Sequence, residues 1–419
     1  MDSARADILA ARHRLDTRGW IPRNAEAFRH LPPPAAEVWL GGTPSATACA
    51  THPLAGAGWT LHPIGHGSHG RVDARWLDAR DALQRDELFA GLPMPGGVDD
   101  AGDSDAAPFA WAHRALCQRG LRLRIGGTSG AERGPSDTVW LQLRHQPRSA
   151  VEAPLLVIEV LAGVHCVLVE THDRQELACQ QPVVQNLQAH IRLGEGATLQ
   201  HLRIATPGAS DRIAHHLQAR LGPGARYEHA LLASGSGYHL QRNVICLHEK
   251  GAAARSAGLL LAADAVLEHQ VRISHGATQT ASSIEDLVLA RGAARAVVQA
   301  HTRIAPGAAG ADVRQGLVGI PTGGQPKLVL RPHLEIHHDQ VQARHGATWG
   351  ALPQDALFYA RQRGLDERSA RRLIVEGMAG ALMQRCFSDD RLVGALGIEA
   401  LLRDVVARHL APHAEAVHG

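Results

Sequence analysis

The chain has 419 residues, enough for two or three domains at roughly 150 residues each, and 45% of them are hydrophobic, which excludes a largely disordered protein. The 43 Lys and Arg residues nearly balance the 41 Asp and Glu residues, so a dedicated nucleic-acid binder, which needs a concentrated basic excess, is not expected. Aromatic residues make up only 4% while glycine numbers 43, and this combination indicates many tight turns and few aromatic walls for a substrate pocket.

The positions of the cysteines and lysines argue against further classes of function. The six cysteines are scattered without a Cys-x-x-Cys pair, so a complete zinc or iron–sulfur ligand set within this chain is not expected. Scattered thiols and the absence of an apolar signal segment predict a cytoplasmic protein. The two lysines, Lys250 and Lys327, do not stand in a Gly-Lys-Ser/Thr sequence. Any ATP hydrolysis therefore has to come from a partner.

The N-terminal part, residues 1–110, predicts helices and loops. The apolar spacing in residues 4–15 is that of a helix, and residues 74–88 predict a second, charged helix. Residues 93–108 are rich in Pro, Gly, Asp and Ser and predict a linker or long loop. Residues 65–70 match Gly-x-Gly-x-x-Gly, but no βαβ unit surrounds them, so a loop is favoured over a dinucleotide site.

Residues 111–350 have a different sequence pattern. Short apolar runs, in which inward-facing and outward-facing positions alternate, are separated by turns. Repeating strand–turn units without helices predict a solenoid, for which a parallel β-helix is the natural candidate. A β-sandwich or barrel with irregular loops is the alternative. Glycine recurs at the expected corners, at Gly196, Gly224, Gly251, Gly276, Gly292 and Gly307.

Residues 351–419 switch to a helical period and predict a separate module. A helix over residues 354–363 ends at Gly364, and Asp366 caps a longer helix that extends to residue 386. Ser388 is predicted to cap a third helix, whose apolar stripe runs to Leu410.

Two sets of residues could bind metal. His333, Glu335, His337 and Asp339 alternate, so on a strand they would share one face, as ligands of a metal patch or, as we favour, as a solvated face in a chain with 27 histidines. His345, beside a glycine where the β region ends, could be a metal ligand or proton carrier. Neither a Gly-x-Ser-x-Gly nor a His-Glu-x-x-His motif is present, and we expect no catalytic activity.

The strongest signal is a long motif near the C-terminus. Residues 332–350 read PHLEIHHDQVQARHGATWG, and residues 355–364 read DALFYARQRG. Together they resemble the C-terminal signature of the SufB/SufD family of iron–sulfur cluster assembly proteins, P-x-L-E-I-x-x-D-x-V-x-x-x-H-G-A-T-x-G followed by A-L-F-Y-x-x-x-R-G. The resemblance continues through residues 366–386, so its strong part covers about the last third of the chain. It is faint near the N-terminus, at residues 20–26.

This resemblance implies a fold and a role. The fold is a right-handed parallel β-helix core flanked by N-terminal and C-terminal helical regions. The role is that of a SufD-like, non-catalytic scaffold subunit of a SufBCD complex, which pairs with a SufB-like subunit and docks a SufC-like ABC-type ATPase at its C-terminal helices. No cofactor would be held stably by this chain. Iron or a transient iron–sulfur cluster would meet it at the SufB interface, and ATP would act through SufC.

The family pattern also assigns individual residues. The length and the lack of cysteine in residues 316–326 favour the SufD-like branch. His345 matches the SufD-like histidine proposed at the SufB interface, whereas Arg344 stands where the family often has cysteine. Metal contact is assigned to His345 and, more remotely, to His333, Glu335 and His337. The residues implied in ATPase docking are Phe358, Tyr359, Arg363, Gly364, Leu373 and Ile374.

Two alternatives belong to other functional classes. A β-helix enzyme acting on carbohydrate would show clustered Asp residues on one solenoid face, and the β region here is poor in Asp. A purely structural solenoid without iron chemistry is the other alternative.

Overall fold

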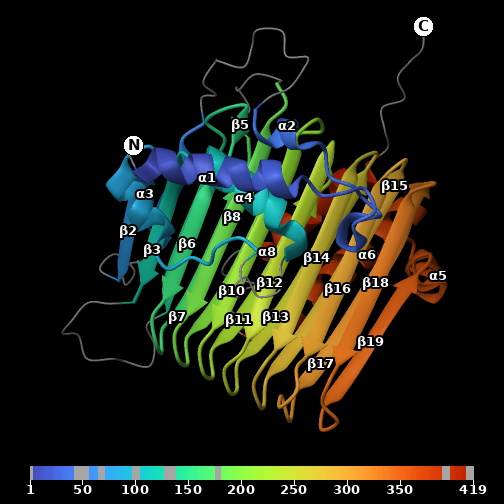
Figure 1. Ribbon diagram of the computed structural model, residues 1–419. Coiled ribbons are helices and arrows are strands. Elements are labelled where there is room, and N and C mark those ends of the chain that lie inside the picture. Colours follow the sequence, from blue (N-terminus) through green and yellow to red (C-terminus); the bar gives the residue numbers. More distant parts are fainter. Residues whose placement is uncertain are drawn as a thin grey trace, which may run out of the picture.

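A computed structural model describes residues 3–41, 56–64, 71–96, 104–126, 138–174, 181–388 and 397–411. The chain winds through two facing sheets, and successive strands of the coil alternate between them (Figure 1). From β6 onward, each strand pairs in parallel with the strand of the same sheet that belongs to the preceding turn of the coil, as β8 does with β6 and β9 with β7. The prediction of a parallel β-solenoid is therefore confirmed, and the alternative of a sandwich or barrel is wrong.

The first sheet, named sheet A here, has nine strands. In spatial order they are β1 (Gly58–Ile64), β4 (Val139–Gln146), β7 (His165–His172), β9 (Thr198–Ala205), β11 (Arg226–Ser234), β13 (Ala253–Ala263), β15 (Ala281–Gly292), β17 (Asp312–Gly324) and β19 (Gln342–Trp349).

The second sheet, named sheet B, has ten strands. In spatial order they are β18 (Lys327–Ile336), β16 (Arg295–Ile304), β14 (Val266–His275), β12 (Tyr238–Leu247), β10 (Arg212–Leu221), β8 (Val184–Leu193), β6 (Leu155–Val160), β3 (Arg119–Ile125) and β2 (Val72–Asp78), with β5 (Val151–Glu152) beside β8.

The two ends of the solenoid differ. At the N-terminal end, β1 and β2 lie antiparallel to β4 and β3 and cover the first coil. At the other end, β18 and β19 are the last strands of their sheets, and no further strand of the described chain pairs with them. The solenoid therefore ends in two open edges side by side.

Alternating apolar residues hold the two sheets together. In β10, for example, Leu217, Ala219 and Leu221 point into the space between the sheets, named the lumen here, and belong to its aliphatic core. Glycine allows the chain to turn at the corners, since Gly196 and Gly224 both have φ of +61°. Gly276 serves differently, because a Cβ there would lie 2.7 Å from the His248 ring.

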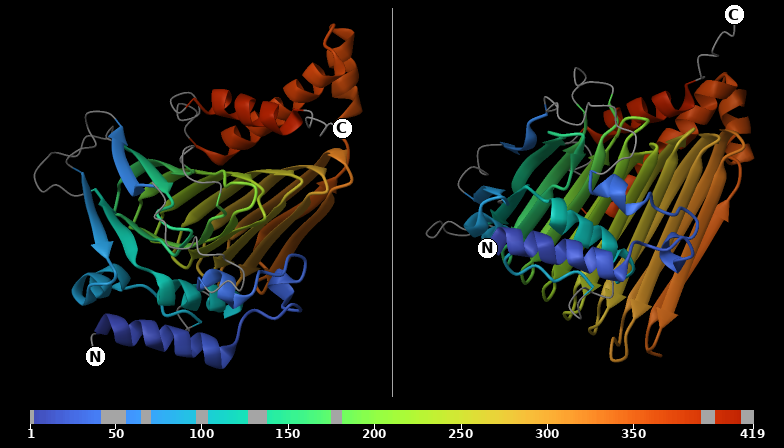
Figure 2. Two further views of the ribbon diagram at one scale, coloured as in Figure 1. Left: turned by 90° about the horizontal axis from the view of Figure 1, so that it is seen from above. Right: turned by 45° about the horizontal axis from the view of Figure 1, so that its top comes forward.

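Helices cover the outer faces of both sheets (Figure 2). On sheet B, buried aromatic residues of the N-terminal region, among them Trp39 and Phe109, pack against strand residues such as Leu240. On sheet A, Val375 and Val406 of the C-terminal helices pack against strand residues such as Leu259. The helical elements are α1 (Ser3–Arg18), η1 (Glu26–Phe28), α2 (Ala36–Trp39), α3 (Ala82–Phe89), η2 (Ser104–Ala106), α4 (Ala107–Leu116), α5 (Gln354–Gln362), α6 (Glu367–Cys386) and α8 (Ile398–Leu410).

Two predicted helices need correction. Of residues 74–88, the first part belongs to strand β2, because it pairs with β3, and helix α3 begins only after the cap Asp81, whose carboxylate accepts from the Gln84 N–H. The third C-terminal helix does not run unbroken from Ser388, because Gly397 has φ of +60° just before α8.

Some predictions fall partly outside the described residues. This holds for the loop 65–70, for residues 97–103 of the predicted linker, and for residues 389–396 after Ser388. The linker ends earlier than predicted, because η2 and α4 already occupy residues 104–116. Among the described residues, no helix is both long enough and apolar enough to cross a bilayer.

Truncating a single buried side chain of the lumen core should destabilise the protein strongly. Leu217 is 1% exposed, so Leu217→Ala should lower the free energy of unfolding by about 2–5 kcal/mol, through lost apolar burial and the cavity left behind. Leu83→Ala, at a side chain that is 81% exposed, is the matched control and should change it little. Urea unfolding measures both, and equal effects of the two would contradict this account of the core.

Candidate functional site

His345 lies on β19, at the open edge of sheet A. Its backbone is in register with Gln315 of β17, and its side chain is exposed. Ala343, two residues earlier, packs against the core residues Ile304 and Val313. Because alternate residues of a strand share one face, His345 also lies on the lumen side, at the open mouth of the solenoid.

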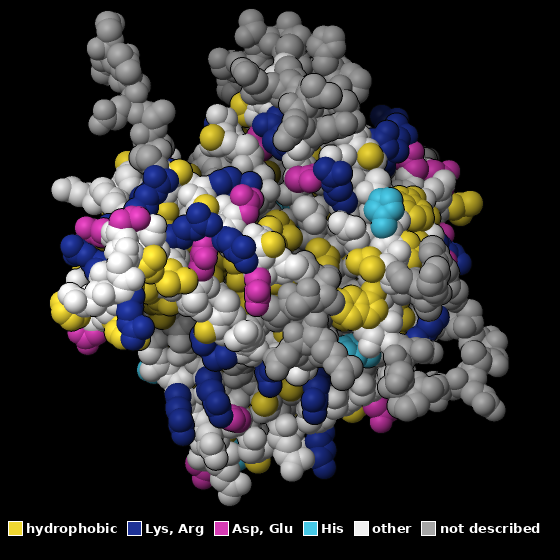
Figure 3. All heavy atoms as spheres, turned by 180° about the vertical axis from the view of Figure 1, so that it is seen from behind, with side chains coloured by type: hydrophobic (Ala, Val, Ile, Leu, Met, Phe, Trp, Pro, Cys, Tyr) yellow, Lys and Arg dark blue, Asp and Glu magenta, His cyan; other side chains and the backbone are white. Residues whose placement is uncertain are grey.

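Arg344 lies on the opposite side of the same strand. It is in register with Arg314, on the outer face of sheet A, where Figure 3 shows basic side chains spread over the lower part of the back face. Arg344 therefore presents a cation to the outer surface, while His345 faces the mouth of the lumen.

Glu335 of the predicted metal patch is already engaged by other side chains. Its Oε1 accepts from Arg303 Nε at 3.2 Å and lies 2.7 Å from His337 Nε2. His333 packs its ring against His301, with 4.7 Å between ring centroids. Among the described residues, no group of three or more His, Cys, Asp or Glu side chains could hold a metal ion. The alternation did place Glu335 and His337 together, but in an ion-pair cluster with Arg303.

The residues implied in ATPase docking differ in exposure and in role. Phe358, Tyr359 and Leu373 are 66%, 61% and 55% exposed, which is unusual for side chains of this size. Arg363 stacks over the Tyr359 ring, with 4.9 Å from its guanidinium carbon to the ring centroid. Ile374 instead packs partly against the core beneath the helices. The two remaining features are conformational: Gly364 has φ of +88°, just after α5, and Asp366 caps α6 by accepting from the Ser369 N–H at 2.9 Å.

A buried polar network inside the lumen was missed by the sequence reasoning. At its centre the Glu170 carboxylate accepts from Arg203 Nε at 3.1 Å, lies 2.9 Å from His201 Nε2 and contacts His172. All four side chains are buried. Burial alone would raise the pKa of Glu170, but the Arg203 cation and the histidine contacts outweigh it and hold that pKa well below its usual range.

The network continues along the lumen. Arg203 donates to Gln241 Oε1 at 3.2 Å, and its other amino group lies 3.2 Å from His215 Nδ1. Several buried polar atoms deeper in the lumen have no partner, among them both ring nitrogens of His229 and Ser256 Oγ. Such atoms are normally satisfied by ordered water. The sequence did contain a signal for this network. Glu170 and His172 occupy inward positions of one alternating strand, and His201 and Arg203 occupy inward positions of another.

A sequence profile described as "SUF system FeS cluster assembly, SufBD core domain" matches residues 143–378, more than half of the chain. The chain belongs to the SufBD family. The matched region runs from the middle of β4 through most of α6, and thus includes the solenoid beyond its first strands, its open edge and His345. The family named from the C-terminal motif is confirmed.

Individual relatives agree with this assignment. The chain is 25% identical over 252 residues to an iron–sulfur cluster assembly SufBD family protein of Synechocystis, covering 57% of this chain and 54% of the relative. It is 29% identical over 223 residues to a SufBD family protein of Mycobacterium leprae, covering 51% of each. It is 30% identical over 114 residues to the iron–sulfur cluster assembly protein SufD of Escherichia coli, covering 27% of this chain and 25% of the relative. The matches thus span about half the length of the first and a quarter of SufD.

The buried histidines predict that acid destabilises this SufBD protein. Burial lowers the pKa of His172 and His239 to about 4, whereas an unfolded histidine titrates near about 6.5. The unfolded chain therefore binds more protons between these values, and stability that is full above about pH 6.5 is lost as the pH falls toward 4. Urea unfolding between about pH 7 and pH 5 should show this decline.

A variant tests the contribution of the lumen network to this decline. His172→Gln removes one depressed group, so proton uptake on unfolding should fall by about one. His62→Gln, at an exposed side chain, is the control and should keep the slope. A slope that is the same in both variants would contradict the role assigned to His172.

Proposed function

We propose that this chain is a SufD-like, non-catalytic scaffold subunit of a cytoplasmic iron–sulfur cluster assembly complex, paired with a SufB-like subunit. The open end of the solenoid carries this proposal. β18 and β19 end their sheets there without a further strand in the described chain, and β19 is exposed along most of its length. Unpaired strand edges present backbone donors and acceptors that another sheet can complete. A subunit of similar architecture could continue both sheets across this end.

The position of His345 at that edge gives it a chemical task. An imidazole at the mouth of the lumen, next to the proposed interface, can bind iron or a transient iron–sulfur cluster while it is being assembled. We propose His345 as this chain's contribution, with the cluster as cargo and no cofactor held stably. The patch of His333, Glu335 and His337 is a weaker candidate, because Arg303 already engages its carboxylate.

The cysteines within the described residues support a division of labour with the partner. Of the six cysteines, Cys117, Cys166, Cys246 and Cys386 are buried, whereas Cys49 and Cys179 lie outside the described residues. Burial raises the pKa of Cys117 and of Cys166 to about 12, so these two thiols are protonated at neutral pH and poor ligands. In this proposal the sulfur ligands therefore come from the SufB-like subunit.

The C-terminal helices are the proposed docking site for a SufC-like ABC-type ATPase, which supplies the ATP chemistry. Phe358, Tyr359 and Leu373 offer exposed apolar side chains for contact, with Arg363 stacked on Tyr359. Helix α6 packs on β11, β13 and β15 of sheet A, so a pull on these helices reaches the sheet that carries His345. ATP-driven approach of two ATPase subunits would thereby move the open edge and admit iron and sulfide. Membership of the SufBD family argues against a carbohydrate-active enzyme.

Replacing the proposed iron ligand tests the site. His345→Ala should abolish cluster build-up in the co-expressed complex, because the imidazole is lost, while the three subunits still co-purify. Cluster content is read from absorbance and iron analysis. His248→Ala, at an exposed turn histidine, should leave cluster content unchanged. A normal cluster yield with His345→Ala would refute the assignment.

The docking surface has a separate test. Phe358→Ala and Leu373→Ala should each weaken binding of the cognate SufC-like ATPase at least about tenfold, the loss of about 1.4 kcal/mol expected for an apolar anchor. Leu83→Ala, an exposed leucine on α3, is the matched control. Titration by calorimetry gives the dissociation constants, and unchanged affinity in both docking variants would move the ATPase site elsewhere.

A further inference from the structure

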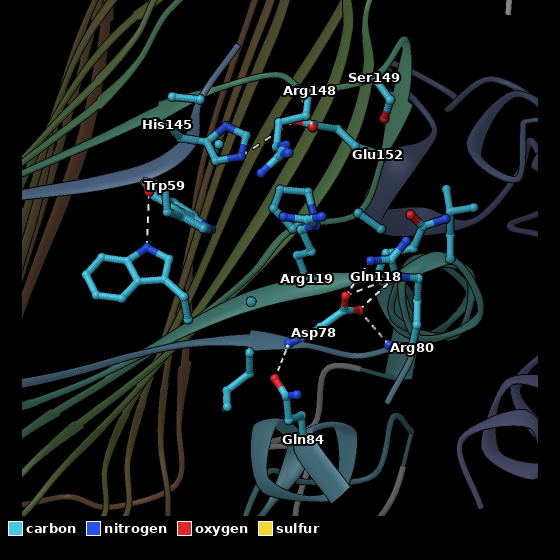
Figure 4. A pocket seen from close by; sticks show the side chains of 18 of the residues that line it. Trp59, Asp78, Arg80, Gln84, Gln118, Arg119, His145, Arg148, Ser149 and Glu152 are labelled. Carbon is cyan, nitrogen blue, oxygen red and sulfur yellow. Dashed lines mark hydrogen bonds and ion pairs between the residues drawn. The ribbon is translucent and has the colours of Figure 1, made fainter. Parts of the chain in front are cut away.

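A cavity of about 360 Å³ opens at the end of the solenoid opposite to His345. It lies between β1 and β4 of sheet A and β2 and β3 of sheet B, with β5 on its rim. Figure 4 shows His145 and Arg148 on one wall, Asp78 and Arg80 on another, and Arg119 between them. Its volume falls within the range of about 300–1,000 Å³ that is typical of small-molecule pockets.

The charges that line the cavity are not balanced internally. Asp78 forms an ion pair with Arg80, whose Nε donates to Asp78 Oδ1 at 2.9 Å. Glu152 accepts from the backbone N–H of Arg148 at 3.1 Å and lies 3.7 Å from His145 Nε2. The guanidinium groups of Arg119 and Arg148 are not within ion-pair distance of any described carboxylate, although the charge of Arg119 contributes to the lowered pKa of Asp78. The lining carries three arginines, Arg80, Arg119 and Arg148, against the two carboxylates of Asp78 and Glu152, and burial lowers the pKa of His145, so one positive charge is left in excess, which suits an anionic ligand.

Two tryptophans add a donor and a flat surface. Trp59 is only 8% exposed, lines the cavity, and its indole Nε1 has no hydrogen-bond partner. A buried donor without a partner is costly unless a ligand or water accepts from it. Trp76 is 53% exposed. Its indole N–H donates to the Trp59 carbonyl oxygen at 3.1 Å, and this hydrogen bond holds the ring in place. An exposed indole held in place is a surface on which a planar ring can stack.

We infer that this cavity binds a small anionic molecule with a planar ring, of the nucleoside monophosphate class. The anionic group contacts Arg119 and Arg148, the ring stacks on Trp76, and an acceptor atom of the ligand satisfies Trp59 Nε1. The inference does not rest on the proposed role of His345, which lies at the other end of the solenoid. The cavity wall is connected to the lumen network, because His145 Nδ1 lies 3.3 Å from Gln185 Nε2 and Gln185 Oε1 contacts His215.

Three probes separate the two parts of the proposed ligand in calorimetric titrations of the full chain. AMP carries ring and phosphate, adenosine the ring alone, and inorganic phosphate the anion alone. AMP should bind at least about tenfold more tightly than either fragment, because only it uses both the guanidinium groups and the tryptophan surface. Equal affinity of AMP and adenosine, or no heat with AMP at millimolar concentration, would overturn the proposal.

Variants locate the binding. Arg119→Gln and Arg148→Gln should each weaken AMP at least about fivefold and leave adenosine unchanged, and both side chains are exposed, so the fold should tolerate them. Trp59→Phe keeps a ring but removes the unpartnered N–H, and should weaken AMP as well. Arg226→Gln, at an exposed arginine of β11 outside the cavity, is the control and should bind AMP like the unaltered chain. Wild-type affinity in both Arg119→Gln and Arg148→Gln would show that AMP binds elsewhere and refute the site.

Discussion

The hydrogen bonding of each strand to the strand one coil earlier is the interaction on which the other features of this molecule depend. It repeats through both sheets, from β3 and β4 to β18 and β19. A solenoid built this way does not close on itself, so it has two ends that must be covered or left open. At the N-terminal end β1 and β2 reverse direction and cover the first coil, and the cavity with Trp59 and Arg119 forms between them. At the other end β19 presents His345.

The same stacking creates a narrow lumen that is apolar at some levels and polar at others. Leucine, valine and alanine fill most of it, which explains how a chain with 4% aromatic residues can build a sizeable core. Around Glu170 and Arg203 the filling becomes ionic, and each charge is compensated by several buried partners. A buried ion pair of this kind contributes little net stability, but removing one partner leaves an uncompensated charge, so the network constrains which strands can stack next to one another.

The outer faces of the two sheets are covered by different helices. The N-terminal helices bury Trp39 and Phe109 against sheet B, and the C-terminal helices bury Val375 and Val406 against sheet A while leaving Phe358 and Tyr359 exposed. An element whose inner side belongs to the sheet core and whose outer side is apolar can transmit force from a bound partner to the solenoid. The helices over sheet A have both properties, and β19 belongs to that sheet.

The sequence by itself predicted the first two C-terminal helices, through local signals such as the cap Asp366, and the family and its solenoid fold, through the long motif at residues 332–364. The alternating strands and turn glycines such as Gly224 alone left a sandwich or barrel open. Only the tertiary structure decided which strand edges stay open, that His345 and Arg344 face opposite sides, and that Glu170 meets Arg203 and His201. It also assigned residues 74–78 to a strand, since pairing with β3 overrides their helical pattern. These features depend on which coil lies beside which, and residues that are 30 or more positions apart become neighbours only when the coils stack.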